Sequence, residues 1–342
     1  MGKKLFDYVI GNPPYQEENE KNGRQPPVYH MFMDAVDDVA NIVELITPAR
    51  FLFNAGQTPK AWNQKKLYDP HFKVLNYEEH AEKIFPGTDI KGGVAITIRN
   101  KSTNYGEIKV FTSYEELNSV LKKIDFAKEG TISSIVSSRG NYRTTEEFFH
   151  DFPVAKERLG KGTGNMIASN FFEKMPEVST EVKNESNSIS FLCRINNSRM
   201  IRFINKKYIL DNPYLNTFNV AFPKSNGNGK FGEQLTETEV LNIGEGATDT
   251  FISIGLFNTS NEAKNLQKYI RTKFFRALLY IKKVTQDNPK SVFSLIPLQD
   301  FTENSDIDWS KSIHEIDLQL YKKYGLDEKE IDFIETHVKE MA

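Results

Sequence analysis

The chain has 342 residues, and its 44 Lys and Arg against 46 Asp and Glu give a formal net charge of −2. This balance excludes a uniformly basic, histone-like DNA binder, although a local basic face remains open. The single cysteine, Cys193, excludes an internal disulfide and a cysteine-rich zinc site, and the six histidines form no HExxH pair, so we expect no metal site. No apolar run approaches the ~18 residues of a membrane span, and the N-terminus lacks the apolar core of a signal peptide. We therefore expect a cytoplasmic protein without membrane association.

Residues 1–100 are predicted to alternate between strands and helices. Apolar runs predict strands over 5–10, 42–46, 72–77 and 93–98, and helical apolar spacing predicts helices over 28–41 and 61–68. Strands separated by helical segments indicate an α/β layer architecture with a mostly parallel sheet. A short strand over 108–111 and a helix over 114–124 are expected to follow.

The remaining chain has a different character. Residues 126–300 are rich in Ser, Asn and Gly, with expected strands over 188–192 and 250–254 and an amphipathic helix over 268–283. Two helices are expected over 312–324 and 327–341, because Gly325 suits a helix end and Asp327 with Glu330 forms a capping box. We expect three domains, 1–125, 126–300 and a helical tail over 301–342.

The near-zero total charge conceals two basic segments and an acidic tail. Residues 194–230 and 268–290 each carry seven basic residues against one acid, a net charge of +6, whereas residues 300–342 carry −7. Such a distribution suits a surface that binds DNA phosphates, although a solvated surface explains any single charge run as well. The candidate DNA contacts are Arg194, Arg199, Arg202, Lys206, Lys207, Lys224, Lys230, Lys273, Arg276 and Lys283.

The most informative motif is Asn12, Pro13, Pro14 and Tyr15, which directly follows the predicted first strand. The exocyclic nitrogen of adenine is a poor nucleophile because its lone pair is delocalised into the ring. The side-chain oxygen of Asn12 and the carbonyl of Pro13 can accept its two N–H groups and orient the nitrogen. The two prolines fix the backbone, and Tyr15 offers an aromatic face to a base that has left the duplex. Methyl transfer then depends on orientation more than on acid–base chemistry.

The string FDYVIGNPPYQ over residues 6–16 resembles the strand and motif of amino-methylating DNA methyltransferases of the adenine-N6 branch. Residues 42–50 resemble the next strand of that family. Residues 83–98 resemble its hairpin, in which Phe85 matches a second aromatic residue that stacks on the base. Residues 222–233, 272–287 and 307–326 resemble the target-recognition region of type IIG restriction-modification methylases.

This resemblance implies a fold and a function. The fold would be the second half of a Rossmann-like methyltransferase sheet, followed by a mixed α/β target-recognition domain and a helical tail. The chain would methylate adenine N6 in double-stranded DNA within a restriction-modification system, with S-adenosylmethionine as methyl donor. Tyr15 and Phe85 would sandwich the flipped adenine.

The glycine-rich turn with which this family binds its donor is missing from its usual place, since eleven residues precede Asn12. Gly244 and Gly246 are the one other candidate, and we interpret their segment as a turn; the donor-binding residues are therefore unknown. Without a preceding strand, residues 5–10 would form an exposed apolar edge. We therefore expect a partner subunit to dock there and complete the donor site.

Two alternatives remain open. The chain could be a non-catalytic DNA-binding specificity subunit or a remnant, or it could be a restriction subunit. The latter lacks support because no nuclease motif of the PD…ExK kind is evident. The second NPY string, over residues 211–214, has neither a preceding apolar strand nor a second proline, so it predicts a turn.

Overall fold

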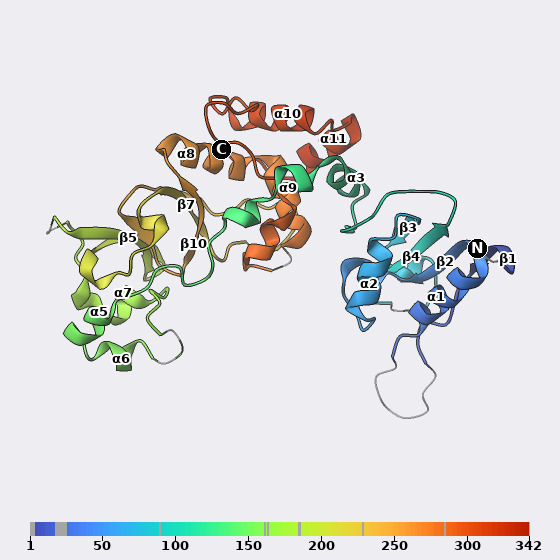
Figure 1. The fold of residues 1–342 in the computed structure, drawn as a ribbon, viewed down its shortest axis with the longest axis horizontal. Coiled ribbons are helices and arrows are strands. Elements are labelled where there is room, and N and C mark those ends of the chain that lie inside the picture. Colours follow the sequence, from blue (N-terminus) through green and yellow to red (C-terminus); the bar gives the residue numbers. More distant parts are fainter. Residues whose placement is uncertain are drawn as a thin grey trace. The chain divides into compact units, whose positions relative to one another are not determined.

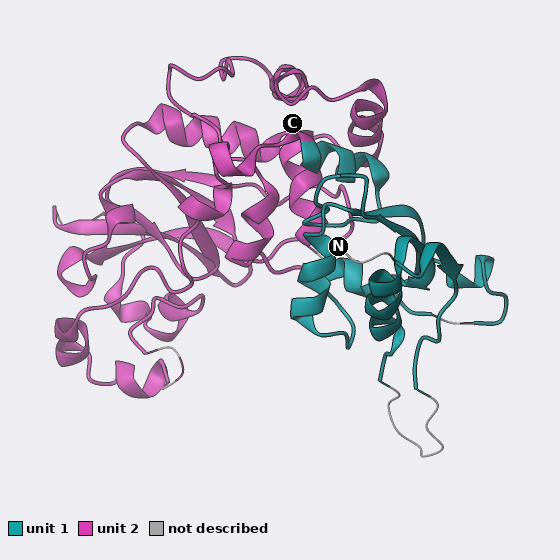
Figure 2. Ribbon diagram, turned by 45° about the vertical axis from the view of Figure 1, so that its right-hand side comes forward, with its two compact units in different colours: residues 1–122 teal, residues 123–342 magenta. Residues whose placement is uncertain are grey.

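The computed structural model describes residues 4–17, 26–88, 90–160, 162, 164–183, 186–227, 229–283 and 285–341. The chain divides into two compact units, Met1–Lys122 and Lys123–Ala342 (Figure 2). Each unit has a hydrophobic core of its own. The sequence predicted divisions after residues 125 and 300; in the structure, residues 301–342 belong to the second unit.

The first unit contains a four-stranded mixed sheet (Figure 1). Its strands are β1 (Phe6–Gly11), β2 (Ala40–Pro48), β3 (Phe72–Glu78) and β4 (Val94–Asn100), in the spatial order β1-β2-β4-β3. β1 pairs with β2 in parallel, whereas β4 is antiparallel to both β2 and β3. β1, β2 and β3 therefore run in the same direction, as predicted for a mostly parallel sheet, and β4 alone is reversed. The reason lies in the connection between β3 and β4, whose described residues contain no crossover helix, so the chain reverses direction and β4 enters between β2 and β3.

Helices cover one face of this sheet. The first unit contains α1 (Tyr29–Val39), α2 (Lys60–Leu67), the start of α3 (Glu115–Lys123), and the 3₁₀ turns η1 (Ala49–Phe53) and η2 (Ala81–Lys83). Side chains of α1, α2 and η1, including Met33, Trp62 and Phe51, pack on Val43 and Leu45 of β2. The strand predicted over 108–111 is absent from these described residues. Lys109 has a left-handed φ of 56°, which interrupts an extended chain.

The opposite face of the sheet is partly open to solvent and carries mostly apolar side chains, together with Glu44, which accepts from the hydroxyl of Tyr8. Because side chains alternate along a strand, Phe6, Tyr8 and Ile10 point away from the core that Val9 enters. These three side chains are exposed, Ile10 to 72%. The strand pairing places partly exposed isoleucines of β2 and β4 on the same face as these three residues of β1. We call this set the open sheet face, and it comprises Phe6, Tyr8, Ile10, Ile42, Ile46, Ile96 and Ile98.

The second unit contains two three-stranded sheets. Their orders are β10-β7-β8 and β6-β5-β9. The strands are β5 (Ser188–Ile195), β6 (Ser198–Asn205), β7 (Phe218–Pro223), β8 (Glu239–Leu241), β9 (Glu245–Ala247) and β10 (Phe251–Phe257). Short helices and 3₁₀ turns pack around them: α4 (Phe126–Glu129), η3 (Ile132–Ile135), α5 (Glu146–Asp151), α6 (Ala155–Arg158), α7 (Phe171–Lys174), η4 (Pro176–Val178), η5 (Lys206–Tyr208), η6 (Pro213–Leu215) and η7 (Lys290–Leu295). The expected mixed α/β character of this region agrees with these elements.

Four longer helices complete the second unit: α8 (Ser260–Arg271), α9 (Lys273–Lys282), α10 (Ile313–Lys323) and α11 (Glu328–His337). The single helix predicted over 268–283 is wrong, because Thr272 has an extended backbone and its side chain accepts from the N–H of Phe275, which begins α9. The predicted capping box of Asp327 and Glu330 is confirmed at the start of α11. Gly325, with a φ of 61°, follows the end of α10 as expected.

Candidate functional site

The segment of residues 12–15, which we call the NPPY segment, leaves the sheet at the end of β1. Gly11 lies opposite Leu45, so the segment emerges at the carboxyl edge of the parallel pair β1 and β2. β4 begins there too, since Val94 pairs with both Pro48 and Glu78. The chain after Glu78, which carries η2 and Phe85, therefore leaves from the same edge. The carboxyl edge of parallel strands is where ligands bind in open α/β sheets.

Backbone contacts fix the C-terminal end of the NPPY segment. The carbonyl of Tyr15 accepts from the N–H of Val28 at 3.1 Å, and the N–H of Glu17 donates to the carbonyl of Pro26 at 3.2 Å. The side chain of Asn12 is exposed and has no hydrogen-bond partner among the described residues. Its amide therefore remains available to a ligand.

The two aromatic residues predicted to hold a base occupy different surroundings. Tyr15 is half-buried against the core of the first unit, and its hydroxyl is buried without a hydrogen-bond partner. Burial raises the pKa of this hydroxyl, which stays protonated. Phe85 is half-buried just after η2, and its carbonyl accepts from the N–H and the hydroxyl of Thr88. The backbone segments that carry Tyr15 and Phe85 leave from the same edge of the sheet.

Arg50 is a residue at this edge that the sequence analysis did not select. It follows the end of β2 within η1, and its side chain is exposed. A Cβ on Gly92 would lie 2.7 Å from Cγ of Arg50, and a Cβ on Gly56 would lie 3.2 Å from Cβ of Arg50. Both glycines also have positive φ angles. The sequence signal for this packing against Arg50 was the adjacent pair Gly92 and Gly93, because paired glycines just before a strand indicate that the loop packs closely against a neighbour.

Burial excludes two of the predicted DNA contacts, and these predictions are wrong. The side chain of Arg276 is fully buried, and its Nε donates to the carbonyls of Arg271 and Thr272. The ammonium of Lys283 is buried and donates to the carbonyls of Asn226, Thr285 and Gln286. Charged side chains enclosed in this way cannot reach a phosphate without opening the fold.

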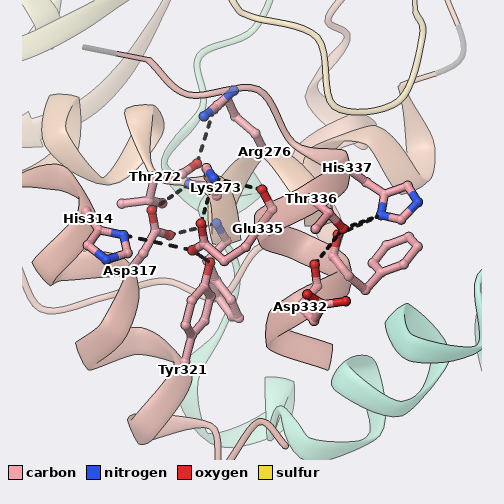
Figure 3. Close-up of polar contacts among 12 residues, drawn as sticks. Thr272, Lys273, Arg276, His314, Asp317, Tyr321, Asp332, Glu335, Thr336 and His337 are labelled. Atoms are coloured by element: carbon pink, nitrogen blue, oxygen red, sulfur yellow. Dashed lines mark hydrogen bonds and ion pairs between the residues drawn. The ribbon is translucent and has the colours of Figure 1, made fainter. Parts of the chain in front are cut away.

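Lys273 is also occupied within the second unit. Its Nζ lies 2.6 Å from a carboxylate oxygen of Glu335. Figure 3 draws this ion pair beside Asp317. Asp317, next to this pair, accepts the N–H groups of Lys273 and Phe274 at 2.9 Å each. The contacts of α9 with α10 and α11 therefore engage the ammonium of Lys273 within the fold. The segment 268–290 is not a free basic face.

In the segment 194–230, most predicted contacts form ion pairs. Arg199 pairs with Glu239, Arg202 with Glu181, Lys207 with Glu147 and Asp151, and Lys224 with Asp249. Nε of Arg194 donates to the carbonyl of Asn197. Lys206 and Lys230 are exposed. The net positive potential of this segment is therefore smaller than its composition predicts.

The turn that contains Gly244 and Gly246 does not fit the methyl donor. Gly244, with a φ of 83°, lies between the short strands β8 and β9, and β10 follows rather than a helix. A Cβ on Gly246 would lie 2.8 Å from the ring of Phe191, so this glycine allows core packing instead of ligand approach. The edge of β1 that faces away from β2 pairs with no other described strand. The described residues thus supply no donor pocket of the glycine-turn type.

Residues 1–85 match the model of a family described as Eco57I restriction-modification methylase. The predicted resemblance to restriction-modification adenine methylases is confirmed over this part of the chain. A protein of Mycoplasma pneumoniae, described as an uncharacterized adenine-specific methylase, is 27% identical over 146 residues, which cover 41% of this chain and 31% of that protein. The match therefore spans about a third of the length of this curated relative.

Two solved structures show a remote likeness. The type IIG restriction endonuclease BpuSI gives a TM-score of 0.31 at 10% identity, over 93% of this chain and 50% of that one. The ATP-dependent type ISP restriction-modification enzyme LlaBIII, bound to DNA, gives a TM-score of 0.25 at 10% identity, over 97% and 29%. In the part of the chain that the structure describes, no helix is both long and apolar enough to cross a bilayer.

Proposed function

We propose that this chain is the base-holding and DNA-reading part of an adenine-N6 DNA methyltransferase in a restriction-modification system. The observation that carries the proposal is the NPPY segment at the carboxyl edge of β1, with the exposed, unpartnered amide of Asn12. The match of residues 1–85 to a restriction-modification methylase family supports it.

In this proposal the target adenine leaves the duplex and enters the carboxyl edge of the sheet. Oδ1 of Asn12 and the carbonyl oxygen of Pro13 accept the two N–H groups of the exocyclic amine. These contacts orient its lone pair, and Pro14 holds the turn. The rings of Tyr15 and Phe85 stack on the base. S-adenosylmethionine, when bound, supplies the activated methyl group.

The open sheet face and the free edge of β1 support a partner that carries the donor site. Leu5 is 75% exposed beside the edge, and Phe6 and Ile10 follow it on the same strand. An unpaired, apolar edge strand is a template for another strand, and a parallel pair such as β1 and β2 is normally covered on both faces. We propose that a partner subunit adds a strand next to β1 and helices over the open sheet face.

The test is a gene replacement in the native cells. Asn12→Ala should remove N6-methyladenine from the chromosomal target site while the protein level is unchanged. The exocyclic amine of the adenine loses the side-chain oxygen that accepts its N–H group and orients its lone pair for the reaction. Asn76→Ala, which changes an exposed asparagine on β3, is the matched control and should leave methylation intact. Full methylation in the Asn12→Ala cells would refute the catalytic role of the NPPY segment.

A second candidate function is a DNA-binding specificity subunit that transfers no methyl group. The turn at Gly244 and Gly246 favours it, since Gly246 packs against Phe191 and the described residues form no donor pocket of the glycine-turn type. This candidate predicts equal chromosomal methylation in the wild-type and Asn12→Ala cells, with altered target choice when the second unit is changed.

A further inference from the structure

A short loop of the second unit, residues 137–142, presents an arginine that the sequence did not single out. We call it the Arg139 loop. It follows η3 and lies against β10, and Ser138 and Arg139 at its tip are exposed. Nε of Arg139 donates to Oδ2 of Asp249 at 3.2 Å, and the side chain of Arg139 is nevertheless 72% exposed. The guanidinium is thus fixed at one nitrogen while most of the side chain faces solvent.

The backbone of the Arg139 loop is anchored on both sides of its tip. The N–H of Ser137 donates to the carbonyl of Ser253 on β10, and the hydroxyl of Tyr142 contacts the hydroxyl of the same serine at 3.2 Å. The N–H of Gly140 donates to Oδ1 of Asp249 at 3.2 Å. Gly140 has a φ of 65°, and a Cβ there would lie 2.4 Å from Sδ of Met166, so the turn depends on glycine.

The predicted turn over residues 211–214 contributes a further anchor. Nδ2 of Asn212 donates to the carbonyl of Asn141 at 2.6 Å, while its Oδ1 accepts the N–H of Tyr214. The second NPY string therefore holds the Arg139 loop from the side.

Asp249 connects this loop to the Gly- and Asn-rich segment that follows β7. Its side chain is 4% exposed, and the same Oδ2 that accepts from Arg139 also accepts from Nζ of Lys224 at 2.8 Å. Its own N–H donates to the carbonyl of Ile167, which fixes its backbone. One buried carboxylate therefore orients two cations, and the three side chains together keep a net charge of +1.

We propose that Arg139 reads a guanine in the major groove of the target DNA, with Asp249 as its positioning residue. This inference rests on the proposed DNA recognition and names the base and the side chain. With Nε held by Asp249, the two terminal nitrogens of the guanidinium form a fork that matches O6 and N7 of guanine. A phosphate contact does not need such a fixed geometry, whereas discrimination between bases does.

The test selects bound duplexes from a library with a randomised central segment, using the full chain. The wild type should enrich a motif that contains at least one guanine. Arg139→Lys, which keeps the charge and loses the fork, should reduce the preference for that guanine roughly tenfold and leave the other positions unchanged. Asp249→Asn, with its fold checked by circular dichroism, should reduce the same preference. Arg158→Lys, an exposed arginine paired with Glu177, is the matched control and should retain the whole motif.

The outcomes separate the inference from the function on which it rests. An unchanged motif with Arg139→Lys, or equal weakening on all sequences, would overturn the guanine contact and indicate a phosphate contact at most, while DNA recognition stands. No enriched motif with the wild-type chain would refute the proposed DNA recognition and, with it, this inference.

Discussion

The buried carboxyl of Asp317 predicts an unusual pH dependence of stability in the second unit. It lies on α10, caps the N-terminus of α9, and is enclosed near Glu335 and Arg276 (Figure 3). Burial raises its pKa from 3.8 to about 7, although the two backbone N–H groups and Arg276 act in the opposite direction. The folded state therefore keeps a proton that the unfolded state has lost between these pH values.

The sign and size of the effect follow from this difference. Since the folded state binds more protons, the free energy of unfolding falls as the pH rises between the two pKa values. Each pH unit between the two pKa values lowers the free energy of unfolding by about 1.4 kcal/mol. Between pH 5 and pH 8 the contribution of Asp317 should therefore fall by about 2–3 kcal/mol. Above pH 8 the loss is complete.

Urea unfolding at several pH values measures this dependence. The chain has two tryptophans, so a Trp62→Phe background leaves Trp309 as the reporter of the second unit. Asp317→Asn should remove the decrease between pH 5 and pH 8, whereas Asp332→Asn, an exposed carboxyl on α11, should retain it. The same pH dependence in the Asp317→Asn variant would refute a raised pKa at this position.

Three further predictions concern the proposed function. Tyr15→Ala and Phe85→Ala should each weaken binding to the target duplex by ~1–3 kcal/mol through lost base stacking; equal affinity in a fluorescence titration would remove these rings from the base site. Log affinity falls as log salt rises, and Lys206→Glu should make this negative slope shallower by about 1–2, because a phosphate contact is lost. A slope equal to that of the wild type would exclude this contact. The isolated chain should self-associate through the exposed edge of β1, and Ile10→Lys should reduce this association in sedimentation velocity, because a charge protects an edge strand. Leu318→Lys, at an exposed position of α10, should leave the association unchanged. Equal behaviour of the two variants would contradict the open-edge argument.

Local patterns predicted most of the helices and strands of the first unit and the end of β1 at the NPPY segment. These depend on residues close in sequence, such as the apolar run that stops before Pro13. The order of the strands was not accessible in this way. β4 pairs with both β2 and β3 because its connection from β3 lacks a crossover helix, and the sequence pattern of a strand does not record its direction.

The charged residues of the second unit show the same limit. Lys283 lies in a basic segment, yet three backbone carbonyls enclose its ammonium, two of them just after it and one some sixty residues earlier in the chain. Arg139 stands outside both basic segments, and it became a candidate because Asp249, which lies 110 positions later, holds its Nε. Composition counts charges, whereas recognition depends on which charges the fold leaves available.

The central claim is that the chain holds the base and that a partner supplies the donor pocket. Isothermal titration of the purified 342-residue chain with S-adenosylmethionine tests it most directly. The bare edge of β1 and the packing of Gly246 against Phe191 predict no saturable binding at micromolar donor. Adding the partner should restore binding. Micromolar affinity of the chain alone would contradict the account and would show that its own residues form a complete donor site.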